Sequence, residues 1–302
     1  MAPEDIPNRY ISSSFLSSRP PAIFKHSDYF DRARPFPSPA EVRANPILRD
    51  IIGSCTTKFE SLNLVVKYGE KVTASEGLCL QAMQQLLPDQ VPVPEVYGWC
   101  EDGGECFIYM ELIKGVTLES QWESLSDGAK KKVCKQLRTI LDSLRKLEQD
   151  PDDRFLGRID KKPLLDIVFT HKTKPPAGPF ATVKEFHDWL SALIKVGKEI
   201  HFADPSQIPD PWRESLPDDA RVVFTHADLH PSNIMVSPDG SGKVLAIIDW
   251  HQSGWYPDYW EYCKALFTSD FDSDWAKEYI PQFVDVAEFY DSWAWYPRVL
   301  GY

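Results

Sequence analysis

The sequence predicts an α+β protein, with a small antiparallel β-sheet near the N-terminus and a larger, mainly helical part after it. Two stretches carry the short apolar runs of strands, from Leu48 to Gly69 and from Cys106 to Ile113. Beyond them, apolar residues recur at helical spacing from Asp127 to Leu147, which predicts a long amphipathic helix. A chain of 302 residues is long enough for two lobes.

The segments between these stretches suggest that the chain has three parts. We expect an N-terminal arm and short helix over 1–46, a sheet-and-helix part over 47–112, and a helical part over 113–302. The short helix should begin at the capping box that starts with Ser38, since a serine followed three positions later by a glutamate satisfies the first helical amides. Thr182 starts a similar box and predicts another helix.

The most informative stretch contains three polar residues in the spacing His-x-Asp-x-x-x-x-Asn. These are His226, Asp228 and Asn233, and Asp249 then ends a later apolar run. The apolar runs on either side of a polar turn, 234–236 and 244–248, predict a β-hairpin. That hairpin would hold Asn233 and Asp249 at neighbouring strand ends. This order is typical of a kinase catalytic loop and its metal-binding carboxylate.

Phosphoryl transfer explains why these residue types are needed. The reaction needs an aligned acceptor hydroxyl, divalent cations on the phosphates, and positive charge near the transferred group. Asp228 would accept the proton of the acceptor hydroxyl. Asn233 and Asp249 would offer oxygen ligands, which Mg²⁺ prefers. The sequence therefore predicts a phosphotransferase.

Other interpretations of the same residues remain open. A single Asp or Asn in a loop is often simple turn chemistry. For His226 we favour a structural role, as a buried histidine that holds the loop by hydrogen bonds. The set His226, Asp228 and His230 also resembles part of a zinc or iron site, although no further His or Cys cluster lies nearby.

Lys67 closes an apolar run, where a strand lysine would point toward nucleotide phosphates as a fixed charge. Glu76 follows on the next predicted helix and is a candidate ion-pair partner for it. Glu76 also fits a capping box that begins at Thr73, and that role would not need Lys67.

Two further stretches would complete a nucleotide site. The loop before the Lys67 strand should hold the phosphates, with Ser54 as the candidate contact, although it contains the single glycine Gly53. The proline-containing connector Val91 to Val96 leads toward a strand that ends in a glycine-containing turn, as a hinge between two lobes would. Adenine would bind there through the backbone of four residues, namely Met110, Glu111, Leu112 and Ile113.

Composition excludes several classes of function. The formal net charge of -12 argues against nucleic acid as a partner; it suits a cationic substrate, and ordinary solubility explains it equally well. The six cysteines include no Cys-x-x-Cys pair, which favours reduced thiols in the cytoplasm. No membrane-spanning run or signal peptide is expected, and nothing in the sequence indicates an obligate protein partner.

Taken together, the motifs resemble the aminoglycoside phosphotransferase family, especially its fungal members. They are the 226–233 loop, Ile248-Asp249-Trp250, Val65 to Gly69, Tyr109-Met110-Glu111 with Gly115, and Trp260-Glu261. The resemblance spans roughly 47–268 and implies a protein-kinase-like bilobal fold and ATP with Mg²⁺ as cofactors. It implies that Asp228 is the catalytic base and that Asn233 and Asp249 are metal ligands. It also implies that Lys67 binds phosphate with Glu76 as its partner.

Two departures from protein kinases favour a small hydroxyl acceptor, of aminoglycoside, choline or sugar type, over a peptide. Ala227 replaces the arginine that would respond to activation-loop phosphorylation, and the short distance from Asp249 to Trp255 leaves no room for a long activation segment. The alternatives that stay open are a catalytically weak pseudokinase-like nucleotide-binding module and a metal-dependent hydrolase.

Overall fold

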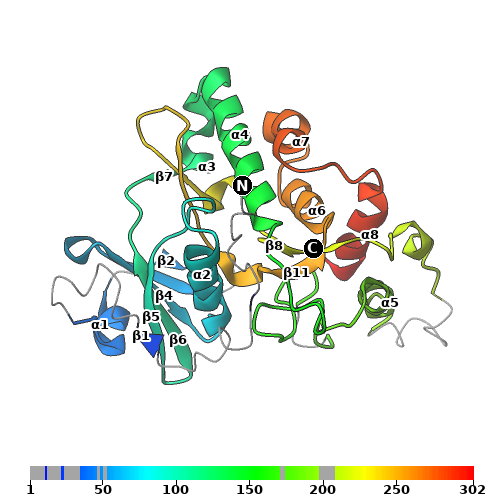
Figure 1. Ribbon diagram of the computed structural model, residues 1–302, viewed down its shortest axis with the longest axis horizontal. Helices are drawn as coiled ribbons and strands as arrows, with labels where there is room; N and C mark the ends of the chain where they lie inside the picture. The colour runs from blue at the N-terminus through cyan, green and yellow to red at the C-terminus, as the bar shows by residue number, and fades with distance from the viewer. Residues whose placement is uncertain are drawn as a thin grey trace, which may run out of the picture. The chain divides into compact units, whose positions relative to one another are not determined.

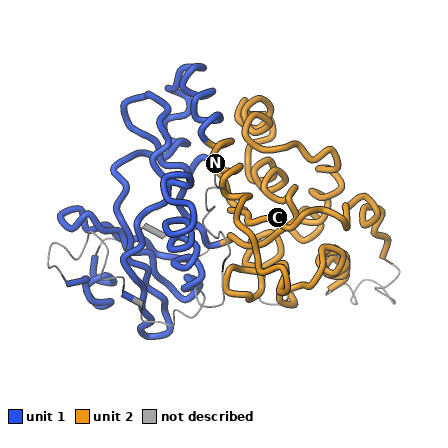
Figure 2. The backbone as a smooth tube through the Cα atoms, in the orientation of Figure 1, with its two compact units in different colours: residues 1–136, 231–251 blue, residues 137–230, 252–302 orange. Residues whose placement is uncertain are grey.

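The computed structural model describes the following parts of the chain: Ile11 and residues 22–23, 35–45, 48–49, 53–170, 174–196 and 208–302. The chain forms two compact units, each built from two segments (Figure 2). Unit 1 comprises residues 1–136 and 231–251, and unit 2 comprises residues 137–230 and 252–302. Most of the predicted N-terminal arm lies outside the described residues. The predicted boundaries at 46 and 112 stay predictions.

Unit 1 contains a six-stranded antiparallel sheet in the order β1-β5-β6-β4-β3-β2 (Figure 1). The strands are β1 (Ala22–Ile23), β2 (Leu48–Arg49), β3 (Cys55–Phe59), β4 (Leu64–Gly69), β5 (Val96–Asp102) and β6 (Glu105–Glu111). The short turn between β3 and β4 is a single 3-10 helix, η3 (Glu60–Leu62), closed by Asn63 at a φ of 54°. The sheet confirms the predicted antiparallel class. Strand β5 was missed, because the connector at Val91 seemed to run directly into the strand at Cys106.

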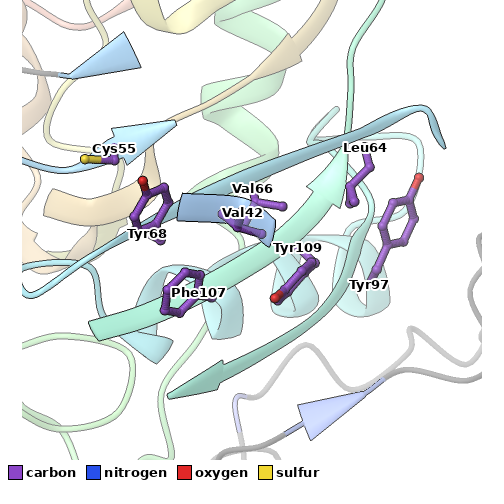
Figure 3. Packing of buried hydrophobic residues seen from close by; sticks show 8 residues of the cluster. All are labelled: Val42, Cys55, Leu64, Val66, Tyr68, Tyr97, Phe107 and Tyr109. Atoms are coloured by element: carbon purple, nitrogen blue, oxygen red, sulfur yellow. The ribbon is translucent and has the colours of Figure 1, made fainter. Parts of the chain in front are cut away.

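Side chains alternate across this sheet, and one face forms a hydrophobic core (Figure 3). Its buried members are Val42, Cys55, Leu64, Val66, Tyr68, Tyr97, Phe107 and Tyr109. Val42 comes from α1 (Pro39–Ala44), which begins at the predicted Ser38 capping box. Because successive strand residues point to opposite faces, Lys67, which lies between Val66 and Tyr68, points away from this core.

The opposite face of the sheet is covered by α2 (Ala74–Leu86), which packs on β5 and β6 (Figure 1). A glycine permits that close packing, since a Cβ on Gly77 would lie 2.6 Å from the Trp99 ring. The capping box predicted at Thr73 is wrong, because the Thr73 side chain makes no capping hydrogen bond. The Glu76 amide instead bonds to the Thr73 carbonyl oxygen at 3.1 Å, which leaves the Glu76 carboxylate for another partner.

The rest of unit 1 includes the predicted hairpin, formed by β9 (Ile234–Val236) and β10 (Val244–Ile247). It extends to a three-stranded sheet through β7 (Val116–Thr117), which precedes two short helices, α3 (Leu118–Gln121) and η4 (Trp122–Ser124). The hairpin tip packs on α4 (Asp127–Leu144). There the Gln136 side chain donates to the Gly242 carbonyl oxygen at 2.7 Å and accepts from the Val244 amide at 3.1 Å. Helix α4 confirms the predicted helix and ends three residues before Leu147.

Unit 2 is mostly helical and contains a two-stranded sheet. Its elements are α5 (Val183–Leu193), η6 (Arg213–Ser215), β8 (Val222–Thr225), η8 (Trp250–Gln252, shared with unit 1), β11 (Gly254–Pro257), α6 (Trp260–Phe267), the π-helix η9 (Trp275–Tyr279), α7 (Ile280–Phe283) and α8 (Tyr290–Leu300). Helix α5 starts where Thr182 accepts from the Glu185 amide, as predicted. All six cysteines are free. Among the described residues, no helix combines the length and apolar character needed to cross a membrane.

Candidate active site

Unit 1 contains a cluster of one lysine and two carboxylates, in which Lys67 and Glu76 are buried and the Asp249 side chain is 31% exposed. Strand β4 places Lys67 on the face that α2 covers, and the Lys67 Nζ atom lies 3.0 Å from Glu76 Oε1 and 2.6 Å from Asp249 Oδ1. The side chain of Lys67 is 9% exposed and that of Glu76 is 2% exposed. The structure therefore brings together three of the predicted site residues, including the pair that the capping interpretation would have separated.

Burial and charge act against each other in this cluster. Burial disfavours the charged ammonium, but the carboxylates of Glu76 and Asp249 outweigh it and raise the pKa of Lys67 above its usual value. Burial raises the pKa of Glu76 to about 7, with Lys67 lowering it and Asp249 raising it. One cation shared by two carboxylates leaves a surplus of negative charge when all three groups ionise. A cation or a positively charged complex is the natural complement to such a site.

Asn233 and Asp249 lie at adjoining ends of the β9–β10 hairpin. Asn233 ends the 3-10 helix η7 (Pro231–Asn233) just before β9, and its carbonyl oxygen accepts from the Ile248 amide at 2.9 Å. Asp249 follows directly and has a φ of 62°, a left-handed conformation that Asp tolerates better than most residues. The hairpin is tied to the connector, since the Ile247 amide donates to the Pro92 carbonyl oxygen at 2.9 Å.

The donor chemistry at these strand ends suits a hard cation. Asp249 offers a carboxylate and Asn233 an amide oxygen, and Mg²⁺ usually takes one or two protein carboxylates and obtains its other ligands from phosphates and water. Within the part of the chain that the structure describes, no three His, Cys, Asp or Glu side chains group as a metal site. The zinc or iron set suggested by His226, Asp228 and His230 is thus not formed among the described residues.

The predicted hinge, 110–113, covers the end of β6 and the two residues after it, and its backbone amides differ in their hydrogen bonds. Met110 lies within the sheet, paired with Val65. The Glu111 amide donates to the Glu95 carbonyl oxygen at 2.8 Å, and the Leu112 amide donates to Asn63 at 3.1 Å.

The next amide, that of Ile113, makes no hydrogen bond to any described residue, while the Ile113 carbonyl oxygen accepts from Gly115 at 3.0 Å. Of the four residues predicted to contact adenine, Ile113 therefore presents an available amide.

Ser54 directly precedes β3, the strand that pairs with the Lys67-bearing strand β4. It is 2% exposed and follows Gly53, whose φ of 86° favours glycine. The loop passes close to the end of β4, where a Cβ on Gly69 would meet the Gly53 carbonyl oxygen at 3.4 Å and the Ser54 Cα at 3.6 Å. Ser54 thus lies beside the strand that carries Lys67, on a loop with a single glycine.

The predicted catalytic loop belongs to unit 2 up to His230 and follows β8. His226 is 1% exposed, and its Nδ1 atom accepts from the Asp228 amide at 3.3 Å, which confirms the structural role predicted for it. Asp228 itself is partly exposed. Ala227 has a φ of 64°, an unusual conformation for a residue other than glycine.

Glu261 holds this strained loop from α6. Its Oε2 atom accepts from the His226 amide at 2.8 Å and from the Ala227 amide at 3.4 Å. Glu261 is 3% exposed, and burial raises its pKa. Strained backbone persists where its surroundings define it, so Glu261 fixes the loop that presents Asp228. In the sequence Glu261 stands out only as part of the motif Trp260-Glu261, and nothing local signals its bond across 35 residues.

Comparisons with known proteins now add to this geometry. A search of curated proteins found no match. Many solved structures are similar at low sequence identity. The streptomycin and ATP ternary complex of APH(2")-IIa has a TM-score of 0.55 and 16% identity, over 82% of this chain and 80% of that chain.

ADP-bound APH(2'')-Ib has a TM-score of 0.54 and 16% identity, with coverages of 91% and 84%. APH(3'')-Id from Streptomyces rimosus has a TM-score of 0.51 and 15% identity, with coverages of 85% and 92%. These similarities confirm the protein-kinase-like fold. The phosphotransferase enzyme family (APH) matches residues 71–297, well over half of the 302 residues. The chain belongs to this phosphotransferase enzyme family.

Proposed function

We propose that the protein transfers the γ-phosphoryl group of ATP to a hydroxyl of a small molecule, with Mg²⁺ as the metal. The observation that carries this proposal is the cluster in which the buried Lys67 contacts both Glu76 and Asp249, at 3.0 Å and 2.6 Å. A buried lysine held by one carboxylate from a helix and another from a strand end is suited to polyphosphate and metal together. Membership of a phosphotransferase family supports the same reaction.

In this proposal Asp249 and Asn233 hold Mg²⁺, which neutralises charge on the phosphates when it is bound. Lys67 contacts a phosphate oxygen, and Glu76 keeps the ammonium directed because it is nearly fully buried and cannot turn to solvent. Ser54 supplies a further contact to the phosphates. The available Ile113 amide donates a hydrogen bond to adenine, and the backbone of Met110, Glu111 and Leu112 forms the rest of that edge.

Asp228 is the proposed catalytic base, which accepts the proton of the acceptor hydroxyl. His226 and Glu261 hold its backbone through the bonds described above. The partly exposed Asp228 side chain stays accessible to an acceptor. A carboxylate suits this role because it can accept a hydrogen bond from the hydroxyl and orient it for attack on the phosphoryl group.

The acceptor we propose is a small molecule with a hydroxyl group and cationic groups. The similar structure of APH(2")-IIa contains streptomycin and ATP, which supports a small molecule beside a nucleotide on this fold. The net charge of -12 favours the approach of cations over long range. Aminoglycosides, choline-like amines and amino sugars are therefore the first compounds to screen.

The test is ATP consumption by the purified protein against such a panel, with Mg²⁺. Wild type should consume ATP with at least one hydroxylated amine, and Asp228→Asn should lose roughly 100-fold or more of that turnover, as expected for a general base. The exposed Asp219→Asn is the matched control and should keep wild-type turnover. Normal turnover in Asp228→Asn would contradict the role of Asp228.

A further inference from the structure

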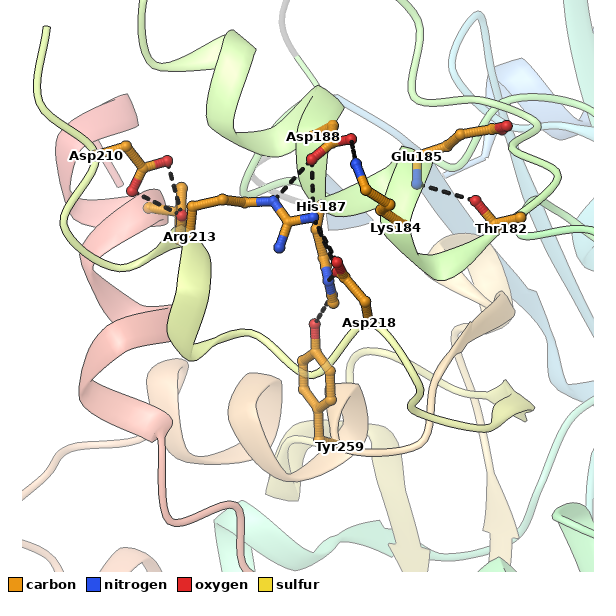
Figure 4. Close-up of polar contacts among 10 residues, drawn as sticks. Thr182, Lys184, Glu185, His187, Asp188, Asp210, Arg213, Asp218 and Tyr259 are labelled. Atoms are coloured by element: carbon orange, nitrogen blue, oxygen red, sulfur yellow. Dashed lines mark hydrogen bonds and ion pairs between the residues drawn. The ribbon is translucent and has the colours of Figure 1, made fainter.

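A second polar cluster lies in unit 2, outside the site described above (Figure 4). At its centre is His187 of α5, whose side chain is fully buried. Its Nδ1 atom lies 2.8 Å from Asp218 Oδ1, and its Nε2 atom lies 2.6 Å from the Tyr259 hydroxyl oxygen. A histidine held at both ring nitrogens has a fixed orientation and connects the segments that carry its two partners.

The partners define the protonation of this histidine. A carboxylate accepts, so Nδ1 carries the proton toward Asp218, and Nε2 accepts from the Tyr259 hydroxyl in the neutral ring. Asp218 is itself fixed by Arg213, which also contacts Asp188 at 2.8 Å. Burial lowers the pKa of His187, although the hydrogen bond to Asp218 opposes that effect. The neutral ring, as an acceptor for Tyr259, is therefore the form present at neutral pH.

Tyr259 immediately precedes α6 and is buried. Its side chain makes no capping hydrogen bond to that helix, and its hydroxyl group has His187 as its one hydrogen-bond partner among the described residues. The ring packs edge-on against Phe289, with centroids 4.9 Å apart. Asp166 also holds α6, since it accepts from Trp260 Nε1, at the first residue of the helix, at 2.8 Å and from Lys264 Nζ, in its middle, at 2.7 Å. His187 thus acts on the residue directly before α6, next to the point where Asp166 holds Trp260.

Glu261 follows two positions after Tyr259, in the first turn of α6. This is the carboxylate that accepts from the His226 and Ala227 amides, directly before Asp228. The contacts form a continuous path through unit 2, from Asp218 to His187, to Tyr259, to the first turn of α6, and to the catalytic loop. The first turn of a helix has amides without helical partners, so contacts from outside the helix help to hold it in place.

We propose that His187 is a positioning residue for the catalytic loop. By holding the Tyr259 hydroxyl it fixes the first turn of α6, and that turn places Glu261 where it can hold the strained backbone at Ala227. The effect of His187 on turnover rests on the proposed function, in which Asp228 is the base. The effect of His187 on the order of the loop does not rest on that function.

Two substitutions of His187 separate its two contacts. In His187→Gln the amide group lies near the position of Nε2 and keeps an acceptor for Tyr259. In His187→Asn the shorter side chain keeps a donor for Asp218 and does not reach Tyr259. Tyr259→Phe removes the hydroxyl group alone. Tyr296→Phe is its matched control, because Tyr296 is likewise buried and its hydroxyl makes a side-chain hydrogen bond, to Asp210 at 2.9 Å, but it lies on α8.

Hydrogen exchange of the His226 and Ala227 amides is measured first, in the absence of any substrate. We expect His187→Asn and Tyr259→Phe to raise the exchange rate by roughly fivefold to tenfold. This factor corresponds to the net free energy that one hydrogen bond contributes. His187→Gln and Tyr296→Phe should stay within roughly twofold of wild type. Wild-type exchange in Tyr259→Phe, or equal exchange in the Asn and Gln variants, would overturn the proposal.

Turnover and nucleotide affinity provide the second measurement. His187→Asn should lower the turnover number with little change in MgATP affinity, because the nucleotide contacts belong to unit 1, and His187→Gln should restore turnover. A fall in MgATP affinity with turnover unchanged would contradict a positioning role. Since exchange is read without substrate, a failure of the proposed function would show itself as absent turnover in wild type and would leave the exchange result standing.

Discussion

Lys264→Met should destabilise the protein strongly, because it leaves a buried carboxylate without its counter-ion. The side chains of Lys264 and Asp166 are both fully buried, with Nζ 2.7 Å from Asp166 Oδ1. Asp166 would keep two neutral donors, Trp260 Nε1 at 2.8 Å and the Val168 amide at 3.0 Å. Removing one partner of a buried pair costs about 3–5 kcal/mol.

That cost should be visible in unfolding. At roughly 2–4 °C per kcal/mol for domains of this size, the Tm should fall by about 6–20 °C. The free energy of unfolding is measured by urea titration, followed by tryptophan fluorescence. Lys277→Met is the control, because Lys277 pairs with Asp272 at the surface, where their side chains are 52% and 88% exposed, and it should change stability by less than about 1 kcal/mol.

The double variant Asp166→Leu with Lys264→Met should recover part of the loss, since an apolar pair leaves no buried charge. A loss of less than about 1 kcal/mol in Lys264→Met alone would refute the reasoning, because it would mean that the carboxylate finds a proton or water at little cost.

Two further predictions concern packing and pH. Gly77→Ala should destabilise by about 1–3 kcal/mol, because its Cβ would lie 2.6 Å from the Trp99 ring, whereas Gly128→Ala in α4, whose nearest neighbour is 3.9 Å away, should be neutral or stabilising in the same urea titration. For His187, burial lowers the pKa below the ordinary value of 6.5. The unfolded chain therefore binds a proton that the folded one does not, so the free energy of unfolding should fall as the pH drops below 6.5. In His187→Gln the same acid titration should show a smaller slope, and an unchanged slope would exclude His187 as its source.

Local patterns predicted much of this fold. Ser38 and Thr182 begin helices as their capping boxes predicted, and the apolar runs on either side of a polar turn form the predicted β9–β10 hairpin. Each of these signals lies within a few residues, where sequence spacing and spatial distance agree.

What sequence could not supply depends on contacts between distant segments. Lys67 and Asp249 are 182 positions apart, and Asp166 and Lys264 are 98 apart, so no spacing rule joins them. Thr73 fits a capping pattern that the structure does not use, since its side chain makes no capping hydrogen bond and the Glu76 side chain pairs with Lys67. The π-helix η9 also has no period that distinguishes it from an ordinary helix.

The most direct test of the central claim is calorimetric titration of ATP into wild type and Asp249→Ala, each with and without Mg²⁺. If the cluster of Lys67, Glu76 and Asp249 is a MgATP site, wild type should bind ATP with Mg²⁺ and much more weakly without it. Asp249→Ala should lose the gain from Mg²⁺. Equal affinity in all four titrations, or no binding in any, would contradict the proposed nucleotide site and with it the proposed phosphotransfer.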